Sequence, residues 1–297
     1  MKDSYNCSSP YANYQGKCTR SNLMTHSPFS PIIKISKIMN AIAIIFALIC
    51  WSKMKESYKE DLAYIHDVGY SDYALKSAPG ILDILAQNNI RDGLVMDLGC
   101  GSGLSALELT KADYQVLGVD ISESMIAIAR TRVPIAEFRV ESLLKTDIPA
   151  CNAVISIGEC LNYLFDRDNN YQTLMQLFER IYNALTARGI FIFDIAEHGQ
   201  VIEGEKVKSF NEGEDWIVLV EKEEDRKNSL LSRRIVTFRK VGEYYRRDDE
   251  LHYLRLYKAA EITKQLRQVG FTVETMNHYG DYQLPQAHVA FVARKST

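Results

Sequence analysis

Between residues 78 and 194 the chain alternates short apolar runs with segments whose apolar residues have helical spacing. The runs have the length and composition of buried strands, and we expect strands over 94–98, 114–120, 137–140, 153–157 and 190–194. The segments between them predict helices over 78–87, 104–111, 123–132 and 171–185. Strands that alternate with helices pair in parallel, so the pattern predicts an α/β fold built on a doubly wound sheet.

The regions on either side of this alternation follow other patterns. Upstream, residues 60–73 indicate one or two short helices, and Pro79 suits the start of the helix over 78–87. Downstream, strand-like segments separated by polar turns predict a small antiparallel β insertion over about 200–258, with strands at 215–221, 230–238, 242–246 and 250–257. A helix over 260–269, ended by Gly270, and strands over 271–276 and 288–293 complete the chain.

The N-terminal region differs from the rest in composition and charge. Residues 1–53 hold six Lys or Arg and one acid, a net charge of +5, so with a total of −3 the remainder carries −8. Residues 1–31 are rich in Ser, Asn, Tyr and Pro without apolar periodicity, which predicts disorder. We therefore expect two parts: an extension over 1–53 and a folded domain over 54–297.

The extension contains one apolar run, at 38–51. As a helix its 14 residues would span about 21 Å, less than the roughly 30 Å of a hydrocarbon core. It begins after 37 residues and no small-residue cleavage site follows it, which disfavours a signal peptide. We expect a cytoplasmic protein, with weak membrane anchoring through 38–51 as the less favoured alternative.

Composition excludes several classes of protein. A hydrophobic fraction of 46% and a charged fraction of 25% are typical of globular proteins, and pI 6.1 disfavours a dedicated nucleic-acid-binding protein. The basic pairs 226–227 and 233–234 lie among acids and predict solvated strand faces, and the tyrosines near 244–253 have acidic neighbours, so no nucleic-acid partner is expected. The six cysteines form no CxxC pair, which predicts reduced thiols and no metal site.

A glycine-rich loop joins the first predicted strand to its helix and carries the most specific chemistry. Gly99, Cys100, Gly101 and Gly103 follow Asp97. The dinucleotide fingerprint places its third glycine three residues after the second, whereas here the interval is two. A carboxylate two residues before the first glycine would repel a pyrophosphate and attract an ammonium group. The loop therefore favours a ligand that carries a cationic amino group.

A second acid ends the next predicted strand, 23 residues after Asp97. In this topology Asp120 reaches a ribose diol, although alone it could equally cap the following helix. Ile121 and Met125 are placed to flank an adenine. One acid for an amino acid moiety and one for a ribose together describe S-adenosylmethionine.

The segment from Asp97 to Gly103, with Asp120 after the second strand, resembles motif I and its acidic partner in class I S-adenosylmethionine-dependent methyltransferases. The resemblance covers about residues 54–297 and is closest to the small-molecule members. Segments 157–163 and 252–257 are similar to segments in bacterial members of broad methyltransferase groups. The resemblance implies a Rossmann-like seven-stranded sheet whose last strand, near 288–293, is antiparallel.

The resemblance also implies roles for individual residues. Asp97 and the backbone of 99–103 would hold the methionine end, and Asp120 the ribose. Ser142 and Leu143 would lie at the adenine, although many members have an Asp where this chain has Glu141-Ser142. Gly158 and Glu159 would lie beside the sulfonium and the acceptor.

Methyl transfer is an in-line displacement that needs a base only when the acceptor arrives protonated. Candidate residues near the acceptor are Tyr64, His66, Glu159, Tyr163 and His252, with His198 a weaker one. Each also has a structural interpretation: the tyrosines as half-buried aromatics, His66 as a turn cap beside Asp67, and His252 as the polar face of a strand. Glu159 is the best of them, because ligands of open α/β sheets bind beyond the strands' carboxyl ends.

These patterns together predict a methyltransferase that acts on a small-molecule acceptor, with the β insertion as a wall or lid over it. The alternatives are an NAD- or nucleotide-sugar-linked oxidoreductase, which the loop spacing and Asp97 disfavour, and a noncatalytic module that keeps the cofactor pocket.

Overall fold

The protein's structure, a computed structural model, describes residues 57–166 and 168–295. Its centre is a seven-stranded sheet of order β10-β13-β5-β4-β1-β2-β3. The strands are β1 (Gly93–Leu98), β2 (Tyr114–Asp120), β3 (Glu137–Val140), β4 (Cys151–Ser156), β5 (Leu185–Ala196), β10 (Phe271–Met276) and β13 (His288–Lys295). Strands β1 to β5 pair in parallel, whereas β13 runs antiparallel to both β5 and β10. The predicted fold class, with its antiparallel last strand, is confirmed.

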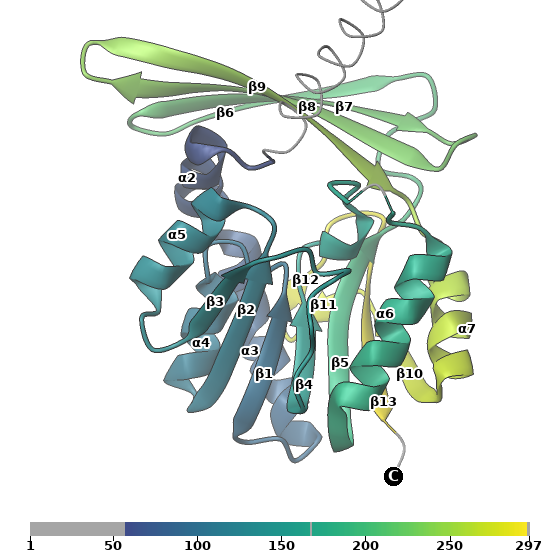
Figure 1. Cartoon of the computed structure of the whole chain (residues 1–297). Helices are drawn as coiled ribbons and strands as arrows, with labels where there is room; N and C mark the ends of the chain where they lie inside the picture. Colours follow the sequence, from purple (N-terminus) through teal and green to yellow (C-terminus); the bar gives the residue numbers. More distant parts are fainter. Residues whose placement is uncertain (1–56, 167, 296–297) are drawn as a thin grey trace, which may run out of the picture. The chain divides into compact units, whose positions relative to one another are not determined.

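Helices cover both faces of this sheet (Figure 1). Alternate strand residues explain the two layers: Met96 packs in one buried cluster and its neighbour Val95 in the other. The first cluster includes residues of α6 (Tyr171–Ala184) and α7 (Ala259–Val269). The second includes residues of α3 (Asp72–Gln87), α4 (Leu104–Lys111) and α5 (Glu123–Arg132).

Local sequence sets the ends of several helices. Ser122 precedes α5, and its hydroxyl accepts a hydrogen bond from the Met125 amide at 3.1 Å. Asn170 caps α6 in the same way, through the amides of Gln172 and Thr173. Gly270 ends α7 in the left-handed region at φ 116°, as predicted.

A second sheet of four antiparallel strands follows β5 in the chain. It consists of β6 (Lys206–Glu212), β7 (Trp216–Asp225), β8 (Leu230–Val241) and β9 (Tyr244–Arg255), in that order. It lies beyond the carboxyl ends of the parallel strands (Figure 1), where Leu164 donates its amide hydrogen to Tyr253 at 2.8 Å. Helix α2 (Glu60–Gly69) packs between α5 and β8, and three short elements complete the fold: η1 (Cys160–Asn162), β11 (His278–Tyr279) and β12 (Tyr282–Gln283).

Some element boundaries differ from the sequence-based prediction. Pro79 lies inside α3, which begins seven residues earlier, at Asp72. Buried residues on one face, among them Ser77 and Ile81, hold the helix together through the proline, whose missing amide costs one hydrogen bond.

The second sheet also differs from its prediction. Segments 242–246 and 250–257 were expected as two strands, but β9 is continuous because every residue from Tyr244 to Arg255 pairs with β8. Strand β6 was missed, since all its residues are exposed and it lacks a buried apolar face.

No helix within 57–166 or 168–295 has both the length and the apolar character that a membrane crossing requires. The apolar run 38–51 and the expected boundary at residue 54 lie outside the described residues.

We predict that a chain beginning at Met54 folds as the full chain does. The Glu250 carboxylate accepts hydrogen bonds from the Tyr58 and Lys59 amides, at 2.8 and 2.9 Å, and this chain keeps both. A chain beginning at Asp61 loses them, and hydrogen bonds to a charged group are worth about 1.5–3 kcal/mol each. In urea unfolding, the first chain should match the full-length free energy to within about 0.5 kcal/mol, and the second should lose more than about 2 kcal/mol. If the first chain fails to fold, residues 1–53 are structural and the boundary is wrong.

Candidate active site

A cavity of about 660 Å³ lies where the carboxyl ends of the parallel strands face the second sheet. Its floor comes from the loops after β1, β2, β3 and β4, and its roof from alternate residues of β7 and β8. The roof residues are Val218, Val220, Lys222, Arg233 and Ile235. The parallel sheet therefore supplies the floor of the cavity, and the antiparallel sheet supplies its roof.

The glycine loop forms one wall of the cavity. Gly99 and Gly101 line it, with φ angles of 82° and 52° that favour glycine. A Cβ on Gly99 would meet the Cys160 sulfur at 2.6 Å, whereas one on Gly101 would meet nothing within 4 Å. The backbone at Gly101 is thus open to the cavity.

Asp97 lies beneath this loop at the end of β1, with 2% of its surface exposed. Its Oδ2 atom has no hydrogen-bond partner within the described part of the chain. Burial, with a contribution from the Asp120 charge, raises the pKa of Asp97 to about 7. A buried carboxylate without a partner is costly, and a cationic ligand group would relieve that cost.

Asp120 both lines the cavity and holds the loop in place. Its Oδ2 accepts the Gly101 amide hydrogen at 3.0 Å, and its Oδ1 accepts that of Ser122 at 2.8 Å. Burial raises the pKa of Asp120, and these two amides act against the rise. Ile121 and Met125 follow and also line the cavity.

Ser142 and Leu143 also line the cavity, together with a carboxylate that was not predicted. The Ser142 hydroxyl donates to Asp166 Oδ2 at 2.9 Å. Asp166 thereby supplies an acid beside the position where many methyltransferases have an Asp, while Glu141 instead accepts a hydrogen bond from Thr146. Asp166 is distant in sequence from β3, so motif spacing gave no signal for it.

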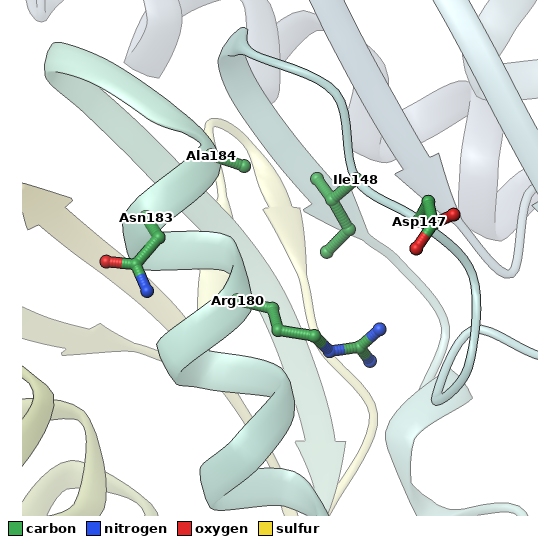
Figure 2. A pocket seen from close by; sticks show the side chains of 5 residues that line it. All are labelled: Asp147, Ile148, Arg180, Asn183 and Ala184. Carbon is green, nitrogen blue, oxygen red and sulfur yellow. The ribbon is translucent and has the colours of Figure 1, made fainter.

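The loop that carries these residues is anchored from behind by α6. Figure 2 shows Arg180 extending from this helix toward the segment with Asp147 and Ile148. Its guanidinium donates to the Thr146 and Leu144 carbonyls, at 2.8 and 2.5 Å. Because these bonds already occupy the arginine, the hollow in Figure 2 is part of the scaffold.

Besides Asp97, which lies beneath the glycine loop, two further predicted cofactor residues do not line the cavity. The Cys100 side chain is buried in the core and approaches Gly118. Gly103 begins α4 with φ 78°, and a Cβ there would meet the Ala129 Cβ at 3.0 Å, so this glycine allows α4 and α5 to pack closely. Cys100 and Gly103 therefore contribute to the packing beneath the glycine loop.

Glu159 lines the opposite side of the cavity and is 8% exposed, with a left-handed φ of 54°. Its carboxylate accepts hydrogen bonds from Arg233 Nη1 on β8 and from His288 Nε2 on β13, the latter at 2.6 Å. Burial alone would raise the pKa of Glu159, but Arg233 and His288 hold it well below its usual range. A carboxylate held ionised in this way is a poor proton acceptor.

Asp194 of β5 supports the loop that carries Glu159. It accepts the Gly158 amide hydrogen at 3.0 Å, and those of Glu159 and the Tyr279 hydroxyl at 2.5 and 3.1 Å. Burial raises the pKa of Asp194 to about 6 despite the amides. Gly158 itself lines the cavity.

Aromatic side chains and one histidine complete the acceptor side. The Tyr163 hydroxyl lies 3.1 Å from both the Tyr58 hydroxyl and Arg233 Nη1. His66, from α2, also lines the cavity, and its Nδ1 has no partner among the described residues. Burial lowers the pKa of His66 to about 4, so the imidazole is neutral at physiological pH. Tyr58 was not predicted, since it precedes every clear motif.

Three candidates lie elsewhere. Tyr64 packs under the Arg239 guanidinium, 3.4 Å from its ring centroid, and its hydroxyl bonds to Asp215. His252 is buried behind the Tyr58 ring and bonds to Glu250 at 2.8 Å. His198 bonds to Glu224 and Ser229. None of the three candidates lines the cavity, which favours their structural interpretation.

The basic pair at 233–234 requires a correction. Both residues were expected on a solvated strand face, but strand alternation puts them on opposite faces. The Arg233 side chain is 12% exposed and pairs with Glu159, whereas Arg234 is 56% exposed and pairs with Asp249. The sequence did contain an indication of this: the apolar Ile235, two residues after Arg233, lies on the same face of β8 as Arg233.

Sequence comparison agrees with this geometry. A family model described as a methyltransferase domain matches residues 95–189. Over 211 residues the chain is 27% identical to a protein of Geobacillus sp. (strain WCH70) with a provisional methyltransferase name, covering 68% of this chain and 84% of the relative. The chain belongs to the class I S-adenosylmethionine-dependent methyltransferases.

Solved structures share the fold of this methyltransferase. An S-adenosylmethionine-dependent methyltransferase from Clostridium acetobutylicum ATCC 824 matches with a TM-score of 0.68 at 21% identity, over 84% of this chain and all of that one. A sugar N-methyltransferase from Streptoalloteichus sp. ATCC 53650 matches with a TM-score of 0.65 at 18% identity, over 82% of this chain and 94% of that one. At these identities the likeness concerns the fold.

The residues of the methyltransferase fit S-adenosylmethionine. The Asp97 Oδ2 atom, which lacks a partner within the described residues, suits its ammonium group, and the Asp120 carboxylate in the cavity wall suits a ribose diol. The apolar Ile121, Met125 and Leu143 suit a purine.

We predict that the affinity of the methyltransferase for S-adenosylmethionine falls as pH drops below about 7. The raised pKa of Asp97 means that the free protein protonates this carboxyl near pH 7, and a neutral carboxyl attracts an ammonium group less. Isothermal titration should show affinity falling about tenfold from pH 8 to pH 6.

Two variants separate Asp97 from other groups that titrate in this range. Asp97→Asn should bind more weakly and show little pH dependence, and Asp97→Ala should lose about 1.5–3 kcal/mol of binding free energy at pH 8. An unchanged dissociation constant for either variant would contradict the role given to Asp97.

Proposed function

We propose that this methyltransferase transfers a methyl group from S-adenosylmethionine to a small organic acceptor held in the cavity. The observation that carries the proposal is that a single cavity joins the glycine loop to the inward face of β7 and β8. An acceptor placed under this roof lies next to the cofactor and largely out of water. The four-stranded sheet is then a lid over the acceptor.

In this proposal Asp97, the open backbone at Gly101 and Asp120 bind the cofactor's polar ends. Bound S-adenosylmethionine supplies a methyl group already activated by a sulfonium, so the protein's main task is to align the acceptor and exclude water. Val218, Val220 and Ile235 exclude water from above, and the hydroxyls of Tyr58 and Tyr163 offer hydrogen bonds that orient the acceptor.

His66 is our candidate to receive a proton from the acceptor. Its ring lines the cavity, is neutral at physiological pH and has an Nδ1 without a partner in the described ranges. Glu159 is the poorer candidate, because Arg233 and His288 occupy its oxygens. We assign Glu159 the role of fixing the roof of the cavity over its floor.

Similar structures support a small acceptor. Besides the sugar N-methyltransferase, a structure from Micromonospora echinaspora named as an amino pentose methyltransferase matches with a TM-score of 0.62 at 15% identity, over 75% of this chain and 92% of that one. The free Cys100, Cys151 and Cys160 in the described part of the chain support the expected cytoplasmic location.

We predict that purified protein with S-adenosylmethionine releases S-adenosylhomocysteine when given the fraction of a cell extract below about 3 kDa, because the cavity of about 660 Å³ accommodates only small ligands beside the cofactor. Product release is measured by mass spectrometry, with the protein-free mixture as control. Release only with the larger fraction would contradict a small acceptor. Cofactor binding without release in either fraction would favour the noncatalytic module.

We predict that His66→Gln lowers kcat by about 10²-fold or more, the usual contribution of a general base, while the Kd for S-adenosylmethionine stays within about twofold. His198→Gln is the matched control, since His198 lies outside the cavity and should leave kcat unchanged. A kcat for His66→Gln within about threefold of wild type would reduce His66 to a wall residue.

A further inference from the structure

Two cations face each other across the roof of the cavity. Lys222 of β7 and Arg233 of β8 are directly paired in the antiparallel ladder, and both line the cavity. Like charges directly opposite in a sheet are destabilising. The rest of the inward face of the roof is apolar, with Val218, Val220 and Ile235. The sheet therefore concentrates positive charge at one end of the cavity roof.

Only one of the two cations is neutralised. Glu159 forms an ion pair with Arg233 and also accepts a hydrogen bond from His288, so its single charge is shared between two donors. Among the described residues, Lys222 forms neither an ion pair nor a hydrogen bond with its ammonium group. Burial, followed by the Arg233 charge, lowers the pKa of Lys222, and the Glu159 charge offsets these two effects only in part.

The other carboxylates that line the cavity are already engaged. Asp120, at the end of β2, and Asp166, in the loop after η1, accept hydrogen bonds on the cofactor side. Asp72 pairs with Lys76 at 2.6 Å on α3. Asp194 does not line the cavity, and it accepts the amide hydrogens of the Gly158 loop from beneath. The charge at Lys222 thus remains for a ligand to balance.

We propose that the acceptor carries an anionic group, a carboxylate or a phosphate, that binds Lys222 in the positive field it shares with Arg233. This rests on the proposed function, since it names the class of acceptor for the same cavity. The anionic group would accept charge-assisted hydrogen bonds from the Lys222 ammonium and relieve its repulsion with Arg233. The apolar roof residues would contact the rest of the acceptor.

The first experiment tests the charge of the acceptor directly. The fraction of a cell extract below about 3 kDa is passed over an anion exchanger at about pH 8, and both eluates are assayed for S-adenosylhomocysteine release. We expect the acceptor activity in the retained fraction. Activity in the unretained fraction overturns the anionic acceptor and leaves the small-molecule function standing, whereas activity in neither, with release only from the larger fraction, refutes the small-molecule function itself.

Phosphatase treatment of the retained fraction then distinguishes the two sources of negative charge. Loss of acceptor activity identifies a phosphate, and persistence identifies a carboxylate.

The second experiment tests Lys222 with the retained acceptor. Lys222→Met keeps the length of the side chain and removes its charge, and should raise KM about tenfold or more, as loss of a charged hydrogen bond does. Lys222→Arg should restore most of the affinity. Lys227→Met is the matched control in the exposed turn between β7 and β8 and should leave KM unchanged.

A folding defect is separated from lost recognition by two further measurements. Relief of the like-charge pair predicts that Lys222→Met keeps or raises the thermal midpoint of unfolding, and its Kd for S-adenosylmethionine should equal that of wild type. A KM for Lys222→Met within about twofold of wild type overturns the assignment of Lys222.

Discussion

The buried ion pair between Glu159 and Arg233 is the contact on which the architecture of the active site depends. It joins the loop after β4 to the inward face of β8, and His288 brings β13 to the same carboxylate. Burying such charges is costly unless each is paired and hydrogen-bonded, and removal of one partner would leave the other uncompensated. The roof of the cavity therefore has one favourable register over the floor, and the volume between them is defined.

The cofactor side uses buried carboxylates in a related way. Asp120 and Asp194 each accept backbone amide hydrogens from a loop that follows a neighbouring strand, at Gly101 and Gly158. Both pKa values are raised because burial outweighs these amides, so the carboxyls hold the loops at some electrostatic cost. Asp97 differs, since its free oxygen has no such amide. In the proposed function this free oxygen of Asp97 is left for the ammonium group, Asp120 both holds its loop and faces the ribose, and Asp194 only supports the scaffold.

The positions of the cofactor-side residues could be predicted from the sequence, whereas those of most acceptor-side residues could not. The reason is how far apart in the chain the contacting residues lie. Asp97, the glycines and Asp120 are fixed by short strand-to-helix connections, so linear spacing carries their geometry. Arg233 reaches Glu159 across 74 residues, and Tyr58 is placed by Glu250 across 192. Such contacts depend on how the two sheets meet. The same limit explains why Tyr64 and His252, which have suitable chemistry, lie outside the cavity.

This division has a consequence for specificity. Residues of the cofactor side lie on the parallel sheet, while Val220, Lys222 and Ile235 lie on a separate antiparallel sheet, which two apolar clusters, ion pairs and hydrogen bonds join to the rest of the protein. Because strand alternation turns every second residue of β7 and β8 toward the cavity, substitutions there change the acceptor's surroundings without touching Asp97 or Asp120. The roof can then vary in charge and size while the methyl donor stays in the same place. A lysine opposite an arginine at this position is best understood as such a specificity feature, because it lowers the stability of the empty protein and gains a favourable partner only when an acid binds.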